Sequence, residues 1–137
     1  GTAREAPPPR ARPIQGTVGE TLADQVRRYL QNLPEDKVPI TYGKLARALG
    51  YWAPGSIAKV TSALEATMRV DAAISTPFVA ARAVSRGGDG LPSKGFFELA
   101  QALGRGPMDG EIDSVFHERL LGEISAKLRK NQEAASG

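Results

Sequence analysis

The sequence has no cysteine and only one histidine in 137 residues. Without cysteine the chain has no disulfide framework, no thiol nucleophile and no thiolate ligand for a metal. A single histidine cannot by itself supply a catalytic triad or a metal site. The lack of cysteine fits a reducing compartment, so we expect a cytoplasmic protein.

Long hydrophobic runs are also missing. No apolar run approaches the roughly 18 residues that a membrane-spanning helix needs, and no basic segment leads into an apolar stretch at the start of the sequence. We therefore expect neither a membrane span nor a secretory signal. Hydrophobic residues make up 41% of the chain, which is enough for one modest core.

The two ends are poor in hydrophobic residues and differ in composition from the middle. Three arginines, Arg4, Arg10 and Arg12, alternate with prolines near the start. This pattern predicts a disordered, basic, proline-rich arm over residues 1–16 and a disordered tail over residues 131–137. The remaining residues, 17–130, are expected to form a single domain.

The spacing of apolar residues predicts helices in the first half of this domain. The first helix is expected to begin at Thr17, which would form a capping box with Glu20, and to end before Pro34. A second, short helix follows Thr41, a plausible N-cap, and ends at Gly50.

A third helix is predicted after a Pro54-Gly55 turn, with Ser56 as its N-cap. Its polar side carries Lys59 and Ser62. Its apolar stripe is expected to face inward and consists of Ile57, Val60, Leu64 and Met68.

The second half of the domain mixes a strand and two more helices. Residues 76–85 are predicted to contain a short strand, and the glycine-rich residues 86–90 a flexible loop. A fourth helix begins after Ser93 and ends at Gly104. A final helix is predicted over residues 111–130 with these residues inward: Ile112, Val115, Phe116, Leu120, Ile124 and Leu128.

This order of elements predicts a mainly α fold, a winged helix-turn-helix-like domain with additional C-terminal helices and a small β element. The third helix would be the reading helix, because it offers small and polar side chains outward. A plain helical bundle with a small, polar solvated face is the alternative.

One segment resembles a known family. Residues 33–50, LPEDKVPITYGKLARALG, are similar to the pattern I-P-x-G-x-V-x-T-Y-G-E-[LI]-A-x-x-[LV]-G of O6-alkylguanine-DNA alkyltransferases and alkyltransferase-like proteins. Residues 56–64, SIAKVTSAL, are similar to the recognition helix A-A-R-x-V-G-x-A-[ML] of that family, and Arg82-Ala83-Val84 with Asp89-Gly90 to its R-V-V…D-G segment. The resemblance spans roughly residues 18–92, about half of the chain.

The resemblance implies a domain that binds the minor groove of DNA through its recognition helix. Tyr42 matches the tyrosine that helps to rotate a nucleotide out of the stack in that family. The arginine that replaces the rotated nucleotide falls on Ala58, with Lys59 beside it. Base flipping is therefore in doubt for this chain.

The catalytic motif departs further from the family. Where the family has P-C-H-R-V or P-W-H-R-V, this chain has Pro77-Phe78-Val79-Ala80-Ala81-Arg82. Alkyl transfer needs a thiolate and a histidine, and this segment has neither. We therefore predict a protein that is not an enzyme and that needs no cofactor and no metal.

The predicted partner is double-stranded DNA, which the net charge of +3 permits without requiring. The predicted DNA-binding residues are Tyr42, Lys44, Arg47, Ser56, Lys59, Ser62, Arg82 and Arg86. The alternative is a protein-protein interaction module or adaptor on the same fold. Its partner would bind an apolar groove or dimer face on the C-terminal helices, around Phe96, Phe97 and Phe116.

Overall fold

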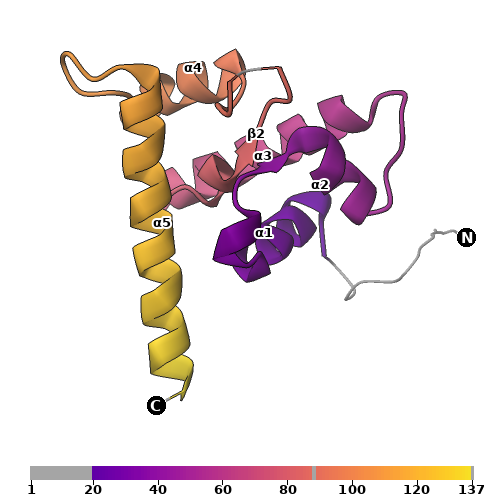
Figure 1. The fold of residues 1–137 in the computed structure, drawn as a ribbon, viewed down its shortest axis with the longest axis horizontal. Helices are drawn as coiled ribbons and strands as arrows, with labels where there is room; N and C mark the ends of the chain where they lie inside the picture. Colours follow the sequence, from indigo (N-terminus) through magenta and orange to yellow (C-terminus); the bar gives the residue numbers. More distant parts are fainter. Residues whose placement is uncertain (1–19, 88, 137) are drawn as a thin grey trace, which may run out of the picture.

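A computed structural model of the chain describes residues 20–87 and 89–136, so the proposed arm over residues 1–16 lies outside the described residues. The described part has a mainly α fold, as expected, with five α-helices and a two-stranded parallel sheet (Figure 1). In chain order the elements are α1 (Leu22–Asn32), the 3-10 helix η2 (Glu35–Lys37), β1 (Ile40–Thr41), α2 (Tyr42–Ala48), α3 (Ser56–Ala73), the 3-10 helix η3 (Val79–Arg82), β2 (Ala83–Val84), α4 (Lys94–Ala102) and α5 (Asp113–Ser136).

Helix α1 begins later than the sequence predicted. The capping box is formed by Thr21 and Asp24, whose side chains each accept a hydrogen bond from the other's backbone N–H at 3.1 Å. Two orphan donors at the start of the helix are satisfied in this way. The expected box of Thr17 and Glu20 is therefore wrong as the start of α1, and Thr17 itself lies outside the described residues.

The caps of α2 are confirmed, whereas the start of α3 needs a correction. The Thr41 hydroxyl accepts a hydrogen bond from the Lys44 N–H, and Gly50 adopts a φ of +89° just beyond the end of α2. The N-cap of α3 is Gly55 in the left-handed conformation, not Ser56, which is instead the first helical residue and buried. Glycine adopts this conformation without the steric cost of a Cβ.

The short strand predicted within residues 76–85 is found at Ala83–Val84, and it is preceded by a 3-10 helix over Val79–Arg82 that the sequence did not predict. Ala83 and Val84 pair in parallel with β1, in the register Ile40 to Ala83 and Thr41 to Val84. Parallel strands need a long crossover, which α2 and α3 supply here. The apolar character of this stretch reflects burial on all sides, since every residue of 78–84 is buried.

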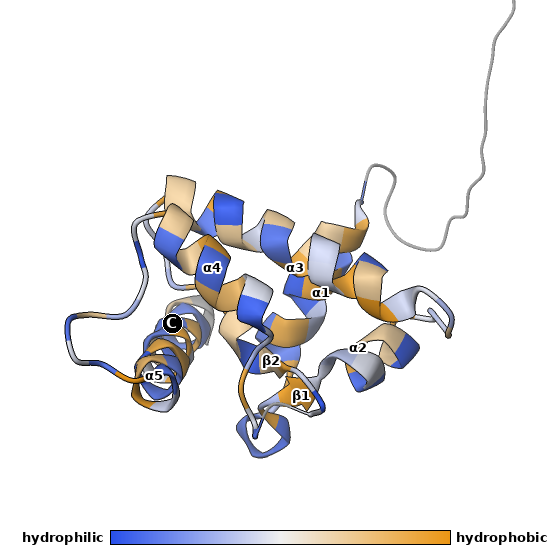
Figure 2. Cartoon of the chain, turned by 90° about the horizontal axis from the view of Figure 1, so that it is seen from above, coloured by the Kyte–Doolittle hydropathy of each residue, from blue (hydrophilic) through white to orange (hydrophobic). Residues whose placement is uncertain are grey.

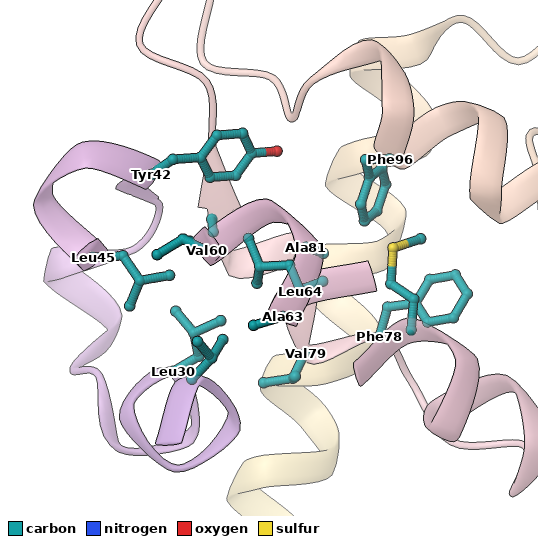
Figure 3. Close-up of a cluster of buried hydrophobic side chains, with 14 of the residues drawn as sticks. Leu30, Tyr42, Leu45, Val60, Ala63, Leu64, Phe78, Val79, Ala81 and Phe96 are labelled. Atoms are coloured by element: carbon teal, nitrogen blue, oxygen red, sulfur yellow. The ribbon is translucent and has the colours of Figure 1, made fainter. Parts of the chain in front are cut away.

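Helix α3 organises the core, because it packs against α1, α2, η3 and α4. Figure 3 shows side chains of α1, α2, α3, η3 and α4 converging, among them Leu30, Leu45, Val60 and Phe96. Leu30, Leu45 and Val60 are fully buried. Dense packing around α3 therefore fixes where α2 lies relative to it.

Helices α4 and α5 complete the fold. Helix α4 follows Ser93 and ends before Gly104, as predicted. Helix α5 lies beside the other helices and is seen almost end-on in Figure 2. It continues to Ser136, so residues 131–136 are helical where the sequence predicted a disordered tail. The part of the chain that the structure describes has no helix long and apolar enough to cross a bilayer.

The buried stripe of α5 is shorter than predicted. Phe116, Leu120 and Ile124 are buried as expected, but Ile112 and Val115 are exposed by 65% and 49%. Helix α5 contacts η3, and Phe116 in its first turn is buried while the neighbouring Val115 is not. Helical periodicity places a residue on a face, but it does not show how far along the helix that face is covered.

Candidate nucleic-acid interface

A groove of about 740 Å³ opens between the start of α2, the start of α3 and the segment that follows β2. Residues from three stretches of sequence line it: Thr41, Tyr42, Gly43, Lys44, Arg47, Trp52, Ala53, Ser56, Ile57, Ser85 and Arg86. Five of the eight predicted DNA-binding residues are among them.

The parallel sheet brings these stretches together. Thr41 pairs with Val84, so the residues that directly follow β2 lie beside the first turn of α2. Beyond β2, the Ser85 N–H donates a hydrogen bond to the Leu91 carbonyl at 2.9 Å. Ser85 and Arg86, which directly follow β2, line the groove.

The groove is basic. Lys44, Arg47 and Arg86 are exposed, and the lining includes no aspartate or glutamate. Within residues 20–87 and 89–136, none of these three cations forms an ion pair. Their charges are therefore available to a polyanion.

The first turn of α3 adds backbone donors to the same groove. Ser56 and Ile57 line it, and Gly55 has no side chain with which to cap the helix. The first N–H groups of a helix lack intrahelical acceptors and carry the positive end of the helix dipole. Ser56 thus borders the groove, although its side chain is buried and its exposed hydroxyl surface is small.

Tyr42 forms the inner wall of the groove, and its ring is buried. Its hydroxyl accepts a hydrogen bond from the Ser93 N–H at 2.9 Å and lies 3.4 Å from the Ser93 Oγ. Figure 3 shows the ring directed into the core, toward α4. This tyrosine joins α2 to the start of α4, so its hydroxyl is not directed at a ligand in the groove.

Two hydrophobic residues of the groove were missed or misplaced by the sequence reasoning. Trp52, in the loop between α2 and α3, is 67% exposed, and Ile57, expected to face inward, is 45% exposed. A Cβ on Gly43 would lie 3.6 Å from Arg47 Nη1 and 3.8 Å from Ile57 Cδ1, so these two side chains flank Gly43. The only available signal for Trp52 was an aromatic residue placed between two turn-forming segments.

Lys59 and Ser62 are exposed on α3 but do not line the groove. They lie along the helix beyond Ile57, on the same outward surface as Ala58. The structure therefore keeps both accessible but places them outside the groove.

Arg82 was predicted to contact DNA, and this prediction is wrong. Its side chain is 1% exposed. One guanidinium nitrogen donates to the Leu30 and Leu33 carbonyls at 2.7 and 3.0 Å, and the other pairs with the Glu35 carboxylate. Leu33 is the C-cap of α1, and the Leu30 carbonyl also accepts a hydrogen bond from the Leu33 N–H at 3.3 Å. Arg82 therefore acts as a buried cap at the end of that helix. Burial lowers the pKa of Arg82, and Glu35 opposes that effect.

The phenylalanines expected to line an apolar groove on the C-terminal helices pack against one another instead. Phe96 and Phe116 are buried, and Phe97 packs between them with ring centroids 5.4 Å from Phe96 and 6.0 Å from Phe116. The two adjacent phenylalanines of α4 thus contribute to one aromatic cluster. Exposed hydrophobic residues lie instead before and in the first turn of α5, namely Met108, Ile112 and Val115.

The single histidine is a packing residue. His117 is 3% exposed, and its Nε2 lies 2.8 Å from the Ala81 carbonyl, to which it donates as Nε2–H. Burial lowers its pKa. Within the part of the chain that the structure describes, no three histidine, aspartate or glutamate side chains lie close enough together to bind a metal ion.

Comparisons of this chain with protein-family models, with curated proteins and with solved structures found no match.

Proposed function

We propose that this chain binds double-stranded DNA without catalysing a reaction, through the basic groove between α2, α3 and the turn after β2. The observation that carries the proposal is the convergence of Lys44, Arg47 and Arg86, from distant parts of the sequence, on one groove without acidic lining. Cations arranged in this way neutralise phosphates and release counterions, which is the main source of affinity for DNA.

The helix pair α2 and α3 would act as a helix-turn-helix, with α3 as the reading helix and the turn after β2 as the wing. The N-terminal turn of α3 lines the basic groove of the protein. In helix-turn-helix motifs, the first residues of the reading helix contact DNA. Lys59 and Ser62 would extend the contact along α3. This arrangement is the one that the resemblance to alkyltransferase-like proteins implies.

Two features limit how far that resemblance is carried. Tyr42 holds Ser93 through its hydroxyl, so we assign it to the wall of the groove and not to rotation of a nucleotide. Phe78 stands where the family has its reactive cysteine or a tryptophan, and it is fully buried. The proposed activity is therefore binding alone.

The test is a fluorescence-anisotropy titration of a labelled duplex at two salt concentrations. Reversing Lys44, Arg47 and Arg86 to glutamate should abolish measurable binding. Replacing one of them with alanine should lower the slope of log affinity against log salt by about 0.9 for each phosphate that is no longer neutralised. Arg129→Ala, at an exposed site on α5 away from the groove, is the matched control. Lack of binding at low salt, or equal weakening by the control, would refute the proposal.

A second candidate function is protein binding, which the exposed residues Met108, Ile112 and Val115 favour. The three lie in one short segment of the sequence, and exposed apolar patches are typical of interaction surfaces. Sedimentation velocity at increasing concentration would detect self-association, and Ile112→Glu should abolish it. A monomer at all concentrations would exclude a dimer at this site.

A further inference from the structure

Trp52 has an unusual place in the groove. It is the only tryptophan of the chain, it is 67% exposed, and it lies in the loop that joins α2 to α3. Ala53 and the partly exposed Ile57 line the same groove. One side of a basic groove thus offers an apolar, aromatic surface to solvent, although tryptophan is largely buried in most proteins.

This combination matches the chemistry of a nucleotide rather than that of a phosphate alone. A nucleobase is flat and has two π faces, and it is linked to phosphates on either side. Stacking of a base on an aromatic side chain contributes to affinity for any base, because every base has such a face. Trp52 would meet the base while Lys44, Arg47 and Arg86 meet the neighbouring phosphates.

In a continuous duplex both faces of each internal base are covered by the adjacent base pairs. An unpaired base can leave the stack at low cost and expose a face. We propose that Trp52 stacks on an unpaired nucleobase, so that the groove binds duplex DNA preferentially at a position where one nucleotide lacks a partner. This inference rests on the proposed function and specifies the form of DNA that is bound.

An apolar protein partner fits the same surface less well. Covering Trp52 and Ile57 with a hydrophobic surface would also remove the three neighbouring cations from water, and unpaired buried charges are costly. A nucleotide supplies both the aromatic face and the compensating negative charge.

The position of Trp52 allows a direct test, because the intrinsic tryptophan fluorescence of this chain comes from that residue alone. Three DNA probes would be titrated: a continuous duplex, the same duplex with one extra unpaired thymine, and the single strand that carries this thymine. Binding is followed by anisotropy of a label on the DNA, and stacking by quenching of Trp52. We expect quenching with the second probe, and an affinity about tenfold higher than for the continuous duplex.

Each outcome separates the inference from the proposed function. Equal affinity for the two duplexes without quenching would leave DNA binding intact and refute stacking by Trp52. If the single strand binds as tightly as the duplex with the unpaired thymine and quenches Trp52, stacking is supported and the proposal of duplex binding fails. No binding to any probe would refute both.

Variants complete the test. Trp52→Ala should remove the preference for the unpaired thymine, whereas Trp52→Phe should retain most of it, since phenylalanine keeps an aromatic face. Ile74→Ala is the matched control, because Ile74 is 66% exposed at the far end of α3 and outside the groove. A similar loss in Ile74→Ala would contradict the inference. Circular dichroism should show the same helix content in all three variants, since each site is exposed.

Discussion

The buried guanidinium of Arg82 allows a sharp test of the structure against the prediction made from the sequence. A DNA contact at this position would mean that Arg82→Ala lowers affinity and leaves stability unchanged. If Arg82 is instead a buried helix cap, Arg82→Ala lowers the stability and leaves the DNA affinity of the folded protein unchanged. The structure supports the second case, because the side chain is 1% exposed and one of its terminal nitrogens donates to two backbone carbonyls within the protein.

The expected cost can be worked out from the contacts. Each hydrogen bond from a charged donor contributes about 1.5–3 kcal/mol, and Arg82 makes two such bonds to the carbonyls of Leu30 and Leu33. The ion pair with Glu35 adds little, since the Glu35 side chain is 61% exposed and can return to water. One donor, Arg82 Nε, has no hydrogen-bond partner among the described residues, which lowers the net contribution. We therefore expect Arg82→Ala to reduce the free energy of unfolding by about 3–4 kcal/mol.

Urea unfolding followed by far-ultraviolet circular dichroism measures this loss. Glu35→Gln is the matched control and should cost at most about 1 kcal/mol, because it removes the exposed partner and keeps the buried caps. Arg82→Lys should fall between the two, since one ammonium group cannot replace a guanidinium that bridges three acceptors. A loss below about 1 kcal/mol for Arg82→Ala, or weaker DNA binding by the still-folded variant, would refute the structural role.

Three further predictions concern packing and pH. Leu30→Ala should cost about 2–5 kcal/mol in urea unfolding because Leu30 is fully buried, whereas Ile112→Ala should cost less than about 0.5 kcal/mol. Burial lowers the pKa of His117, so the unfolded chain takes up this proton first and wild-type stability should fall as the pH drops below about 6.5. His117→Gln should remove that dependence, and an unchanged pH profile would contradict it. The Arg119 guanidinium lowers the pKa of Glu111 from 4.5 to about 2, so the stability that this pair provides should be complete above pH 4.5 and lost as the pH falls toward 2. In Glu111→Gln, the urea midpoint of unfolding should change less with pH across this acid range.

Local signals in the sequence were enough to predict most of the helices. Thr41, Gly50 and Gly104 lie at helix ends because an N-cap acceptor or a left-handed backbone depends on the residue type itself. Ser93 is also the N-cap of α4, although its side chain makes no capping hydrogen bond. The start of α1 was placed too early because two consecutive segments, residues 17–20 and 21–24, offer similar capping residues. The sequence alone did not distinguish them.

Contacts between distant residues account for the errors. The 3-10 helix that precedes the short strand was not predicted, and the buried Asp71 carboxylate, on α3, accepts a hydrogen bond from the Val79 N–H at its start, at 3.2 Å. Residue type and periodicity carry no information about such a partner. The same limit applies to the groove, where Lys44 and Arg47 were correctly placed on α2 but their meeting with Arg86 depends on the pairing of β1 with β2.

Two residues that carry the resemblance to alkyltransferase-like proteins have internal partners in this structure. The hydroxyl of Tyr42 links α2 to the start of α4 by a hydrogen bond with Ser93. The guanidinium of Arg82 links η3 to the end of α1 by hydrogen bonds to two carbonyls. Both anchors fix elements on which the basic groove depends, since α2 forms one wall and η3 leads directly into β2. The need to hold this helix pair is a sufficient physical reason for a tyrosine and an arginine at these positions. Packing alone therefore accounts for these two residues, and the chemistry of the groove has to be judged from its exposed side chains, Trp52 and the three cations.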